Sequence, residues 1–464
     1  MQNEFRDPGR FGEFSTAGFN NIHPLAMLSL LGVLVCIFVG NRRTALIAGV
    51  GILCLIPSGQ RLVIAGLDFA FLRILAIGLF ARVATYGELQ RIRFSLLDGL
   101  VLFFGLWPVV ALVARGSSIS LVRYVGFAGD LILLYFAARA LVREPDDVRA
   151  MARAIFFVAV PVLCAFTIEK FTGRNFFATF GGVPPFTAIR EGKLRVQGAF
   201  DHPILAGTWW AAVMPLFMVL ILSPVKSRDR LLGTVGAIIC VILVIMTASS
   251  TPLAGLGIAI LGLLLFPIRK NMKLFWVPLL AFAALIHVIH DLGVHHFALA
   301  KFPGLTGSTG AHRYKLIDQC AQRINEWFLF GGDSTYHWGW GLDDVTCEYV
   351  RAAMAGGILQ LMCLLGIFVI VFRDAGRMIK RSSRGSGAVC YGIGIAVAVH
   401  MACFVAVSYF GQITLLFWVT LGALQSLSHY TDEPLQKRRV AVAGPGDSRR
   451  RGGGSSVRAR ARAV

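Results

Sequence analysis

The stretch that decides the fold is the longest polar interruption in an apolar chain. It covers residues 290–348 and reads HDLGVHHFALAKFPGLTGSTGAHRYKLIDQCAQRINEWFLFGGDSTYHWGWGLDDVTCE. Helix-length apolar blocks lie on both sides of it, whereas His, Arg, Asp, Trp and Gly are concentrated within it. Unpaired backbone polar groups are not tolerated in hydrocarbon. The segment is therefore predicted to lie outside a membrane that the flanking blocks cross.

Composition supports a membrane protein. The chain has 464 residues, of which 56% are hydrophobic and 15% charged, and its mean hydropathy is +0.69. About a quarter of the residues of a soluble domain are charged. The formal net charge of +20 lies largely in short inter-helix loops and in the tail, where a positive-inside bias places it. The chain has no basic-aromatic motif, which disfavours nucleic-acid binding.

The predicted fold is an all-α polytopic membrane protein with twelve or thirteen transmembrane helices. A spanning helix needs roughly 20 apolar residues. The candidate blocks are 25–40, 44–57, 63–79, 95–113, 121–141, 150–166, 204–222, 231–245, 252–266, 274–289, 354–372, 388–407 and 413–427. The lower number applies if two short early blocks form one hairpin.

Three parts of the chain follow from this reading: a polar segment (1–24), a transmembrane catalytic domain (25–428) and a basic disordered tail (429–464). Lys and Arg in short loops mark the inner side. They fall in segments that alternate with the spans: 41–43, 81–93, 142–149, 224–230, 269–273, 373–384 and the tail. This alternation places two large loops, about 169–203 and 290–350, on the outer face.

Ionisable residues inside the apolar blocks need partners, because each costs several kcal/mol if it faces lipid. They are Asp68, Arg73, Asp98, Arg123, Asp130 and Arg139. Asp68 and Arg73 are too far apart for one helical face, so each is expected to pair between helices. Arg123 and Arg139 lie near block ends and are expected to reach the interface. Arg73 either lines a substrate cleft or forms a structural ion pair.

The first outer loop brings together three cations, Arg190, Lys193 and Arg195. Outer-face arginines are not needed for topology, and the planar guanidinium suits phosphate because it donates two hydrogen bonds at once. The alternative is ordinary pairing with Glu191 or Asp201. Asp201 is also a candidate cap for the next helix, with Pro203 in its first turn.

The second outer loop offers Arg313 at the start of an amphipathic helix that is predicted to end near Trp327. Histidine is the side chain suited to proton transfer at physiological pH, so His312 and His337 are either candidate bases or solvated loop residues. Three aromatic residues either stack on sugar rings or form an interfacial belt: Tyr336, Trp338 and Trp340.

Metal and redox sites have little support in the sequence. A run of His287, His290, His295 and His296 has only Asp291 nearby to complete a ligand shell, so no metal site is expected. Cys320 and Cys347 fall in the second outer loop. They either form a disulfide, if that face is oxidising, or remain free thiols.

Four stretches resemble the bacterial O-antigen ligase and exopolysaccharide polymerase superfamily over roughly residues 60–430. They are RVQGAFDHPILAG (195–207), TASSTPLAGLGIAIL (247–261), GAHRYKLIDQCAQRINEWFLFGG (310–332) and DVTCEYVRAAMAGGILQL (344–361). The resemblance implies a GT-C type glycosyltransferase of the bacterial inner membrane, with its active site on the periplasmic face. No cofactor, nucleotide sugar or metal is implied.

The implied substrate is a polyprenyl-diphosphate-linked oligosaccharide, transferred to a glycan acceptor. Membrane lipid, a chain-length regulator and export-complex proteins are the other expected partners. The resemblance gives diphosphate binding to outer-loop arginines, with Arg195 and Arg313 at the matching positions. The full set of diphosphate-binding candidates is Arg195, Arg313, Arg190, Lys193 and Arg73.

The chain departs from the ligase pattern at one point. Ligases carry His-Asn-x-Tyr-Leu before the next helix, whereas this chain has Thr346-Cys347-Glu348-Tyr349-Val350. The catalytic candidates are therefore His337, His312, Asp344, Glu348 and His202, with Asp343 beside them. The departure favours a polymerase of lipid-linked repeats. The alternatives are an O-antigen ligase, a transporter of polysaccharide or lipid-linked oligosaccharide, and a structural subunit of an export complex.

Overall fold

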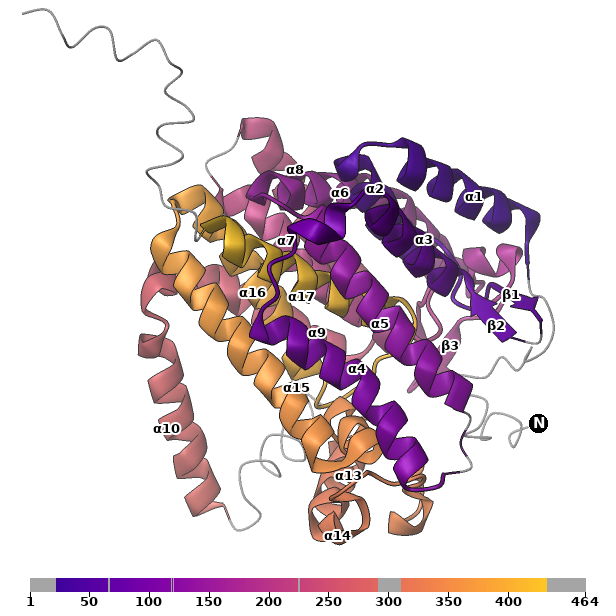
Figure 1. The fold of residues 1–464 in the computed structure, drawn as a ribbon, viewed down its shortest axis with the longest axis vertical. Helices are drawn as coiled ribbons and strands as arrows, with labels where there is room; N and C mark the ends of the chain where they lie inside the picture. The colour runs from indigo at the N-terminus through magenta and orange to yellow at the C-terminus, as the bar shows by residue number, and fades with distance from the viewer. Residues whose placement is uncertain are drawn as a thin grey trace, which may run out of the picture.

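The structure is a computed structural model, and it describes residues 22–65, 67–117, 119, 121–223, 226–290 and 310–431, with side chains at 429–431 excepted. α-Helices dominate these residues, and most of them form one bundle of tilted helices (Figure 1). The few strands form two-stranded hairpins beside the bundle. The fold is that of an all-α polytopic membrane protein.

Eight helices among the described residues are long and apolar enough to cross a membrane. They are α4 (Leu96–Ala114), α5 (Leu121–Leu141), α6 (Pro145–Thr172), α7 (Pro203–Leu222), α8 (Ser227–Met246), α9 (Ser250–Leu265, which η5 extends to Asn271), α15 (Glu348–Arg381) and α16 (Arg384–Cys403). Three shorter apolar helices join them: α1 (Pro24–Val39), α10 (Lys273–Ile289) and α17 (Gln412–Thr431).

The remaining elements are short. The helices are α2 (Arg42–Gly51), α3 (Phe71–Thr85), α13 (Gly310–Gln322) and α14 (Ile324–Trp327). The 3-10 helices are η2 (Ile52–Cys54), η3 (Glu88–Arg91), η4 (Phe176–Phe180), η5 (Phe266–Asn271) and η7 (Tyr336–Trp338). The strands are β1 (Arg61–Ile64), β2 (Leu67–Ala70), β3 (Ala188–Arg190) and β4 (Lys193–Arg195).

The early part of the chain differs from the expected spans. The block 44–57 yields α2, whose 10 residues extend only about 15 Å, half of the hydrocarbon thickness. The block 63–79 starts as the β1–β2 hairpin, and its helix begins only at Phe71. Arg61 and Asp68 form an ion pair across the hairpin, Nη1 to Oδ2, at 2.7 Å. The prediction of a span over 63–79 was therefore wrong in its first half.

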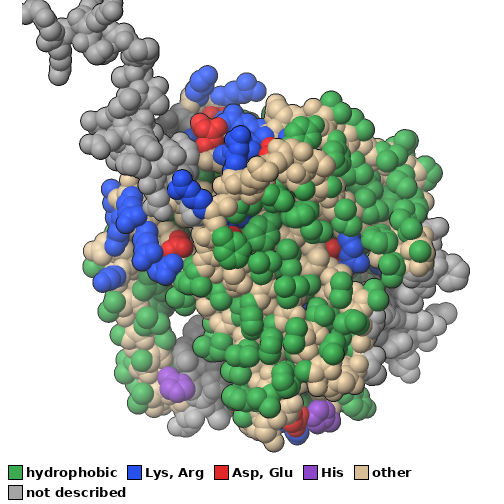
Figure 2. Space-filling model, viewed as in Figure 1, with side chains coloured by type: hydrophobic (Ala, Val, Ile, Leu, Met, Phe, Trp, Pro, Cys, Tyr) green, Lys and Arg blue, Asp and Glu red, His purple; other side chains and the backbone are tan. Residues whose placement is uncertain are grey.

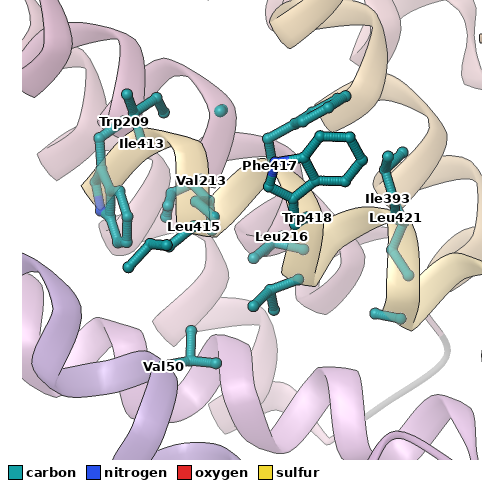
Figure 3. Close-up of a cluster of buried hydrophobic side chains, with 14 of the residues drawn as sticks. Val50, Trp209, Val213, Leu216, Ile393, Ile413, Leu415, Phe417, Trp418 and Leu421 are labelled. Carbon is teal, nitrogen blue, oxygen red and sulfur yellow. The ribbon is translucent and has the colours of Figure 1, made fainter. Parts of the chain in front are cut away.

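Helix α7 is the centre of the bundle. It has 89% of its apolar stretch buried, against 33–44% for α4, α5, α6, α8, α9 and α15. It packs against α8, α9 and α16. Trp209, Val213 and Leu216 of α7 lie close to Ile413, Leu415 and Trp418 of α17 (Figure 3). A helix whose sequence is apolar all round, with no polar face, is expected to be buried on all sides.

Buried ion pairs join neighbouring helices. Arg139 of α5 donates to Asp98 of α4 from Nε to Oδ1 at 2.9 Å, and these side chains are 2% and 0% exposed. The expectation that Arg139 reaches the interface was therefore wrong, because Asp98 holds it inside the bundle. Arg73 of α3 pairs with Asp130 of α5 through two 2.9 Å bonds. This is a pair between helices, as expected, although the partner is Asp130 and not Asp68.

The two ends of the bundle differ in charge. Lys and Arg gather over one end, the upper left in Figure 2, and hydrophobic side chains cover most of the face below them. Here α15 ends, α16 and α8 begin, and η5 lies. We call this the basic end. At the other end lie α13, α14 and the β3–β4 hairpin, which belong to the two large loops (Figure 1). We call this the loop end.

Candidate functional site

The β3–β4 hairpin presents three cations on one face. Its register pairs Arg190 with Lys193 and Ala188 with Arg195. Directly opposed residues, and residues two apart on one strand, share a face. The turn residues Glu191 and Gly192 have φ of 51° and 72°, as a two-residue type I′ turn requires. The hairpin therefore directs Arg190, Lys193 and Arg195 to the same side.

A buried carboxylate fixes the backbone that follows the hairpin. Glu169, in the last turn of α6, accepts the N–H groups of Gln197 at 3.0 Å and Gly198 at 2.9 Å. Asn175 Nδ2 donates to the Gly198 carbonyl at 2.8 Å, and Gln412 Nε2 donates to the Ala199 carbonyl at 2.9 Å. Arg195 therefore stands immediately before a rigid turn that α6 and α17 hold in place.

Arg195 is a buried cation without a carboxylate partner among the described residues. Its side chain belongs to a residue that is only 7% exposed, and Nη2 donates to Ser249 Oγ at 2.7 Å. Its Nε is buried and makes no hydrogen bond within the described part of the chain. Burial, and then the charge of Arg190, lower the pKa of Arg195 to about 10. A buried charge of this kind is costly unless a counter-ion compensates it.

Arg313 comes from the second loop to the same place. It lies in α13, is 3% exposed, and donates from Nη2 to Thr251 Oγ1 at 3.1 Å. Burial, and then the charge of Arg190, lower the pKa of Arg313 to about 10. Arg195 and Arg313 therefore bind two hydroxyls that are two residues apart, and Arg190 acts electrostatically on both.

The point of convergence is the start of α9. Ser249 precedes the helix and Thr251 is in its first turn, and the Ser249 side chain gives α9 no capping bond. A helix N-terminus carries a partial positive charge and N–H groups without intrahelical partners. Two arginines at such an end make an arrangement suited to a phosphate or diphosphate. Sequence reasoning assigned no role to Ser249 or Thr251, although a Ser-Ser-Thr run before an apolar block is a helix-start signal.

The other two cations of the hairpin are more exposed. Lys193 is exposed, and Arg190 pairs loosely with Glu191, Nε to Oε1 at 3.9 Å. Both lie on the face of the hairpin that carries Arg195. This places Arg190 and Lys193 on the approach to the buried arginines.

Asp201 does not cap α7, contrary to expectation. Its carboxylate accepts a hydrogen bond from Ser58 Oγ instead. The cap is His202, whose Nδ1 accepts the N–H of Ile204 at 3.1 Å, and Pro203 is the first helical residue, as expected. Burial, and then the charges of Arg195 and Arg190, lower the pKa of His202 to about 3. The imidazole is therefore neutral at ordinary pH, and its Nδ1 is occupied by the cap.

The second loop is attached to a break in α15. Gly356 and Gly357 interrupt the helix, and Gly357 has φ of 70°. The Ile358 N–H donates to the Phe328 carbonyl at 2.8 Å, while Trp107 Nε1 of α4 donates to the Gly356 carbonyl at 2.7 Å. The second loop and Trp107 thus pair with backbone groups of α15 that would bond within the helix if it were unbroken.

The two candidate histidines of this loop have different surroundings. His312 precedes Arg313, and its Nε2 donates to the Asp344 carbonyl at 3.2 Å. The structure thus brings His312 and Asp344 together beside Arg313. His337 is exposed and donates from Nε2 to Glu326 Oε2 at 2.7 Å. Its partners among the described residues belong to the second loop.

The three loop aromatics also differ. Tyr336 is 76% exposed and Trp340 is 96% exposed, whereas Trp338 is 5% exposed. Trp338 Nε1 donates to Glu326 Oε2 at 2.8 Å. Trp338 therefore contributes to the small core of the loop. Tyr336 and Trp340 are the two that can contact a glycan or the membrane interface.

Glu348 is a buried carboxylate within the stretch that departs from the ligase motif. It is 3% exposed, accepts Arg351 Nε at 2.7 Å and accepts the Tyr409 N–H at 3.0 Å. It lines a cavity of about 10 Å³, room for about one water. Tyr409 belongs to the α16–α17 connector, to which the sequence analysis gave no role. In the sequence, this connector could have been noticed as a polar interruption, because a Ser-Tyr pair and a Gly-Gln pair lie between two apolar blocks.

Arg73 is placed as a structural ion pair. Both ends of its guanidinium fork are taken by Asp130, and Nη1 donates to the Asp68 carbonyl at 3.1 Å. Its charge is matched, in contrast to that of Arg195. This geometry favours the structural alternative over the lining of a substrate cleft.

Cys320 and Cys347 are free thiols, both buried in the core of the second loop. Burial raises the pKa of the Cys320 thiol to about 12 and that of Cys347 to about 11. Within the described ranges, no group of three His, Cys, Asp or Glu is arranged to hold a metal ion. His295 and His296 of the histidine run lie outside those ranges.

The fold thus defines a multi-pass α-helical membrane protein with a cationic site at its loop end. Comparison with known proteins finds no matching family model and no matching curated protein.

Proposed function

We propose that this protein is a membrane glycosyltransferase that polymerises oligosaccharide repeats carried on polyprenyl diphosphate. The observation that carries the proposal is the convergence of Arg195 and Arg313 on the first turn of α9. Arg195 donates to Ser249 at 2.7 Å and has no carboxylate partner in the described chain. A diphosphate would supply the negative charge that this buried guanidinium lacks.

The chemistry of transfer gives these cations a role. Cleavage of a sugar–diphosphate bond releases an anionic leaving group. Cations placed where that charge develops lower the barrier, and the loss of one such contact typically costs on the order of 3 kcal/mol, about a hundredfold in rate. The site needs no metal for this step if the two guanidinium groups and the α9 N-terminus stabilise the leaving group.

The acceptor hydroxyl needs a base, and two groups have supporting geometry. Glu348 is a buried carboxylate at a small cavity that is lined mainly by aromatic side chains. His312 lies next to Arg313 and contacts the Asp344 backbone. The His202 imidazole is less suited, because its Nδ1 accepts the helix-cap bond. His337 is the third candidate for this base, and substitution of each of the three residues distinguishes them.

The proposed setting is the bacterial inner membrane, with the loop end on the periplasmic side and a GT-C type bundle. The basic end would then face the cytoplasm, in keeping with the positive-inside rule. The polyprenyl chain would lie among the apolar helices while the diphosphate reached the arginines. Substrate would enter sideways from the bilayer.

The test is reconstitution of the purified protein into liposomes that contain polyprenyl-diphosphate-linked oligosaccharide. A polymerase lengthens the lipid-linked glycan into a ladder of repeats. A ligase moves glycan of unchanged length to a new acceptor. Movement of the substrate between leaflets without new glycosidic bonds would overturn the enzyme proposal in favour of a transporter.

The same question can be asked in cells. Deletion of the gene should leave lipid-linked single repeats and remove long surface glycan. Accumulation of finished polymer on the carrier lipid would instead indicate a ligase. A surface glycan of unchanged length and amount would contradict both enzyme readings.

A further inference from the structure

Helix α10 leaves an apolar surface for lipid at the edge of the bundle. None of its residues is buried, and Leu274, Val277 and Leu280 are 62%, 62% and 64% exposed. It stands apart from the other helices in Figure 1, and a gap separates it from the bundle in Figure 2. In a bilayer, hydrocarbon chains would cover these side chains, because none of the residues that the structure describes buries them.

The C-terminal half of α15 carries an apolar ridge that becomes basic. Leu365 and Val369 are 39% and 65% exposed. The next residues at four-residue spacing are Arg373, Arg377 and Arg381, all of them exposed. Arg373 and Arg377 share one carboxylate, Asp374, at 2.9 and 3.5 Å, so this cluster keeps a net positive charge. Residues four apart form a continuous ridge on a helix surface. The ridge therefore runs from exposed aliphatic side chains to three guanidinium groups.

The length of α15 brings these arginines to the headgroup region. The part of α15 after its break, residues 358–381, is about 36 Å long at 1.5 Å per residue, and the hydrocarbon core of a bilayer is about 30 Å thick. If this segment starts at the opposite surface, Arg381 lies beyond the hydrocarbon. Arg373 and Arg377, about 22 and 28 Å along it, reach the phosphate groups by extending their long side chains toward the interface.

Neighbouring segments add positive charge at the same end. Segment η5 packs against α15. Its Arg269 guanidinium stacks 4.0 Å from the centre of the Phe266 ring and donates to the Phe266 carbonyl at 2.9 Å. Across residues 226–230, 269–273 and 373–384 the chain has eleven Lys and Arg but only two Asp. The basic end therefore carries a strong excess of positive charge.

We propose that this surface is a binding site for an anionic phospholipid. The acyl chains lie against the exposed face of α10 and the Leu365–Val369 part of the α15 ridge, and the phosphate is bound by Arg373 and Arg377, with η5 beside them. The joined apolar and basic parts fit a lipid better than a soluble phosphate, which would have no use for the ridge. This site is separate from the loop-end arginines and does not depend on the proposed function.

The experiment measures lipid retained by the purified protein. The protein is placed in nanodiscs of phosphatidylcholine and phosphatidylglycerol in equal amounts, extracted with mild detergent, and analysed by native mass spectrometry. The wild type should retain phosphatidylglycerol preferentially. The triple variant R373Q/R377Q/R381Q should lose at least about fivefold of that preference, because each basic side chain near an anionic lipid contributes to binding.

The matched control removes the same number of charges from the same end but off the ridge. The variant K226Q/R228Q/R230Q changes three exposed cations around the start of α8, and it should keep the phosphatidylglycerol preference. Equal loss in both variants would mean diffuse charge attraction and would overturn the site. Equal retention of the two lipids by the wild type would overturn it without any variant.

Discussion

Arg195 and Arg313, from different loops, donate hydrogen bonds to hydroxyls two residues apart in the chain, Ser249 Oγ at 2.7 Å and Thr251 Oγ1 at 3.1 Å. Neither loop forms this site alone. The hairpin supplies one arginine, α13 supplies the other, and the start of α9 fixes the place where they meet.

Substitution of Arg195 by Ala should reduce polymer formation about a hundredfold, because it removes a cation from the leaving-group site. Arg195→Lys should recover only part of the rate, since a point charge does not reproduce the two-pronged guanidinium. The measurement is the rate of ladder formation in liposomes. Arg174→Ala is the control, because Arg174 is an exposed residue of the same loop. Wild-type rates in Arg195→Ala would remove the basis of the proposed function.

Substitution of Arg139 by Ala should lower the free energy of unfolding by about 3–5 kcal/mol, because Asp98 would remain as an uncompensated buried charge. The double variant R139A/D98N should regain part of this loss. Thermal unfolding in detergent measures both. Arg149→Ala is the matched control, since its partner Asp146 is 59% exposed and exposed pairs contribute about 1 kcal/mol or less. A similar loss in both single variants would contradict the explanation.

Substitution of Gly357 by Ala should destabilise the protein and detach the second loop from α15. The residue has φ of 70°, and an added Cβ would lie 2.4 Å from the Leu329 carbonyl oxygen. Gly366→Ala in the same helix should be neutral or stabilising, because its Cβ would meet only Leu100 at 3.7 Å and Ala favours helix. Limited proteolysis of the loop would report detachment, and equal protection in both variants would refute it.

Stability should fall as the pH falls from 6.5 towards 3, in part because of His202. Its pKa is lowered from 6.5 to about 3 in the folded chain. Over this range the unfolded chain binds a proton that the folded chain resists, so acid favours unfolding. His202→Asn keeps a capping side chain and removes this proton, so its unfolding midpoint should vary less over that pH range. An unchanged pH profile in His202→Asn would contradict this account.

The sequence was a good guide to what depends on local pattern. Long apolar blocks predicted α4–α9, α15 and α16, because spanning helices must satisfy their own backbone. It was a poor guide where partners are distant in sequence. Nothing local to Arg139 indicates that Asp98 pairs with it, and nothing in the apolar pattern of 63–79 indicates that its first half pairs as a hairpin. The choice of His202 over Asp201 as cap depended on Ser58, far away in the chain.

The same limit applies to the candidate site. Arg195 and Arg313 could be selected from the sequence as outer-loop cations, and their resemblance to a family suggested a shared ligand. That Ser249 and Thr251 bring them together requires the path of α9 through the bundle. Trp338 looked equivalent to Trp340, but Trp338 is buried in the apolar core of the second loop and donates to Glu326, while Trp340 is 96% exposed.

The broken turn of α15 sets a limit on how the second loop can change in length. The Ile358 N–H and the Gly332 N–H cross-connect α15 and the loop at 2.8 and 2.9 Å, through the carbonyls of Phe328 and Met354. Insertion or deletion of a residue between 328 and 332, or between 354 and 358, would shift one of these contacts relative to the other. Length variation is therefore expected to be harmful within those two short stretches, whereas a change of length between Gly332 and the start of α15 at Glu348 leaves the register of both contacts intact.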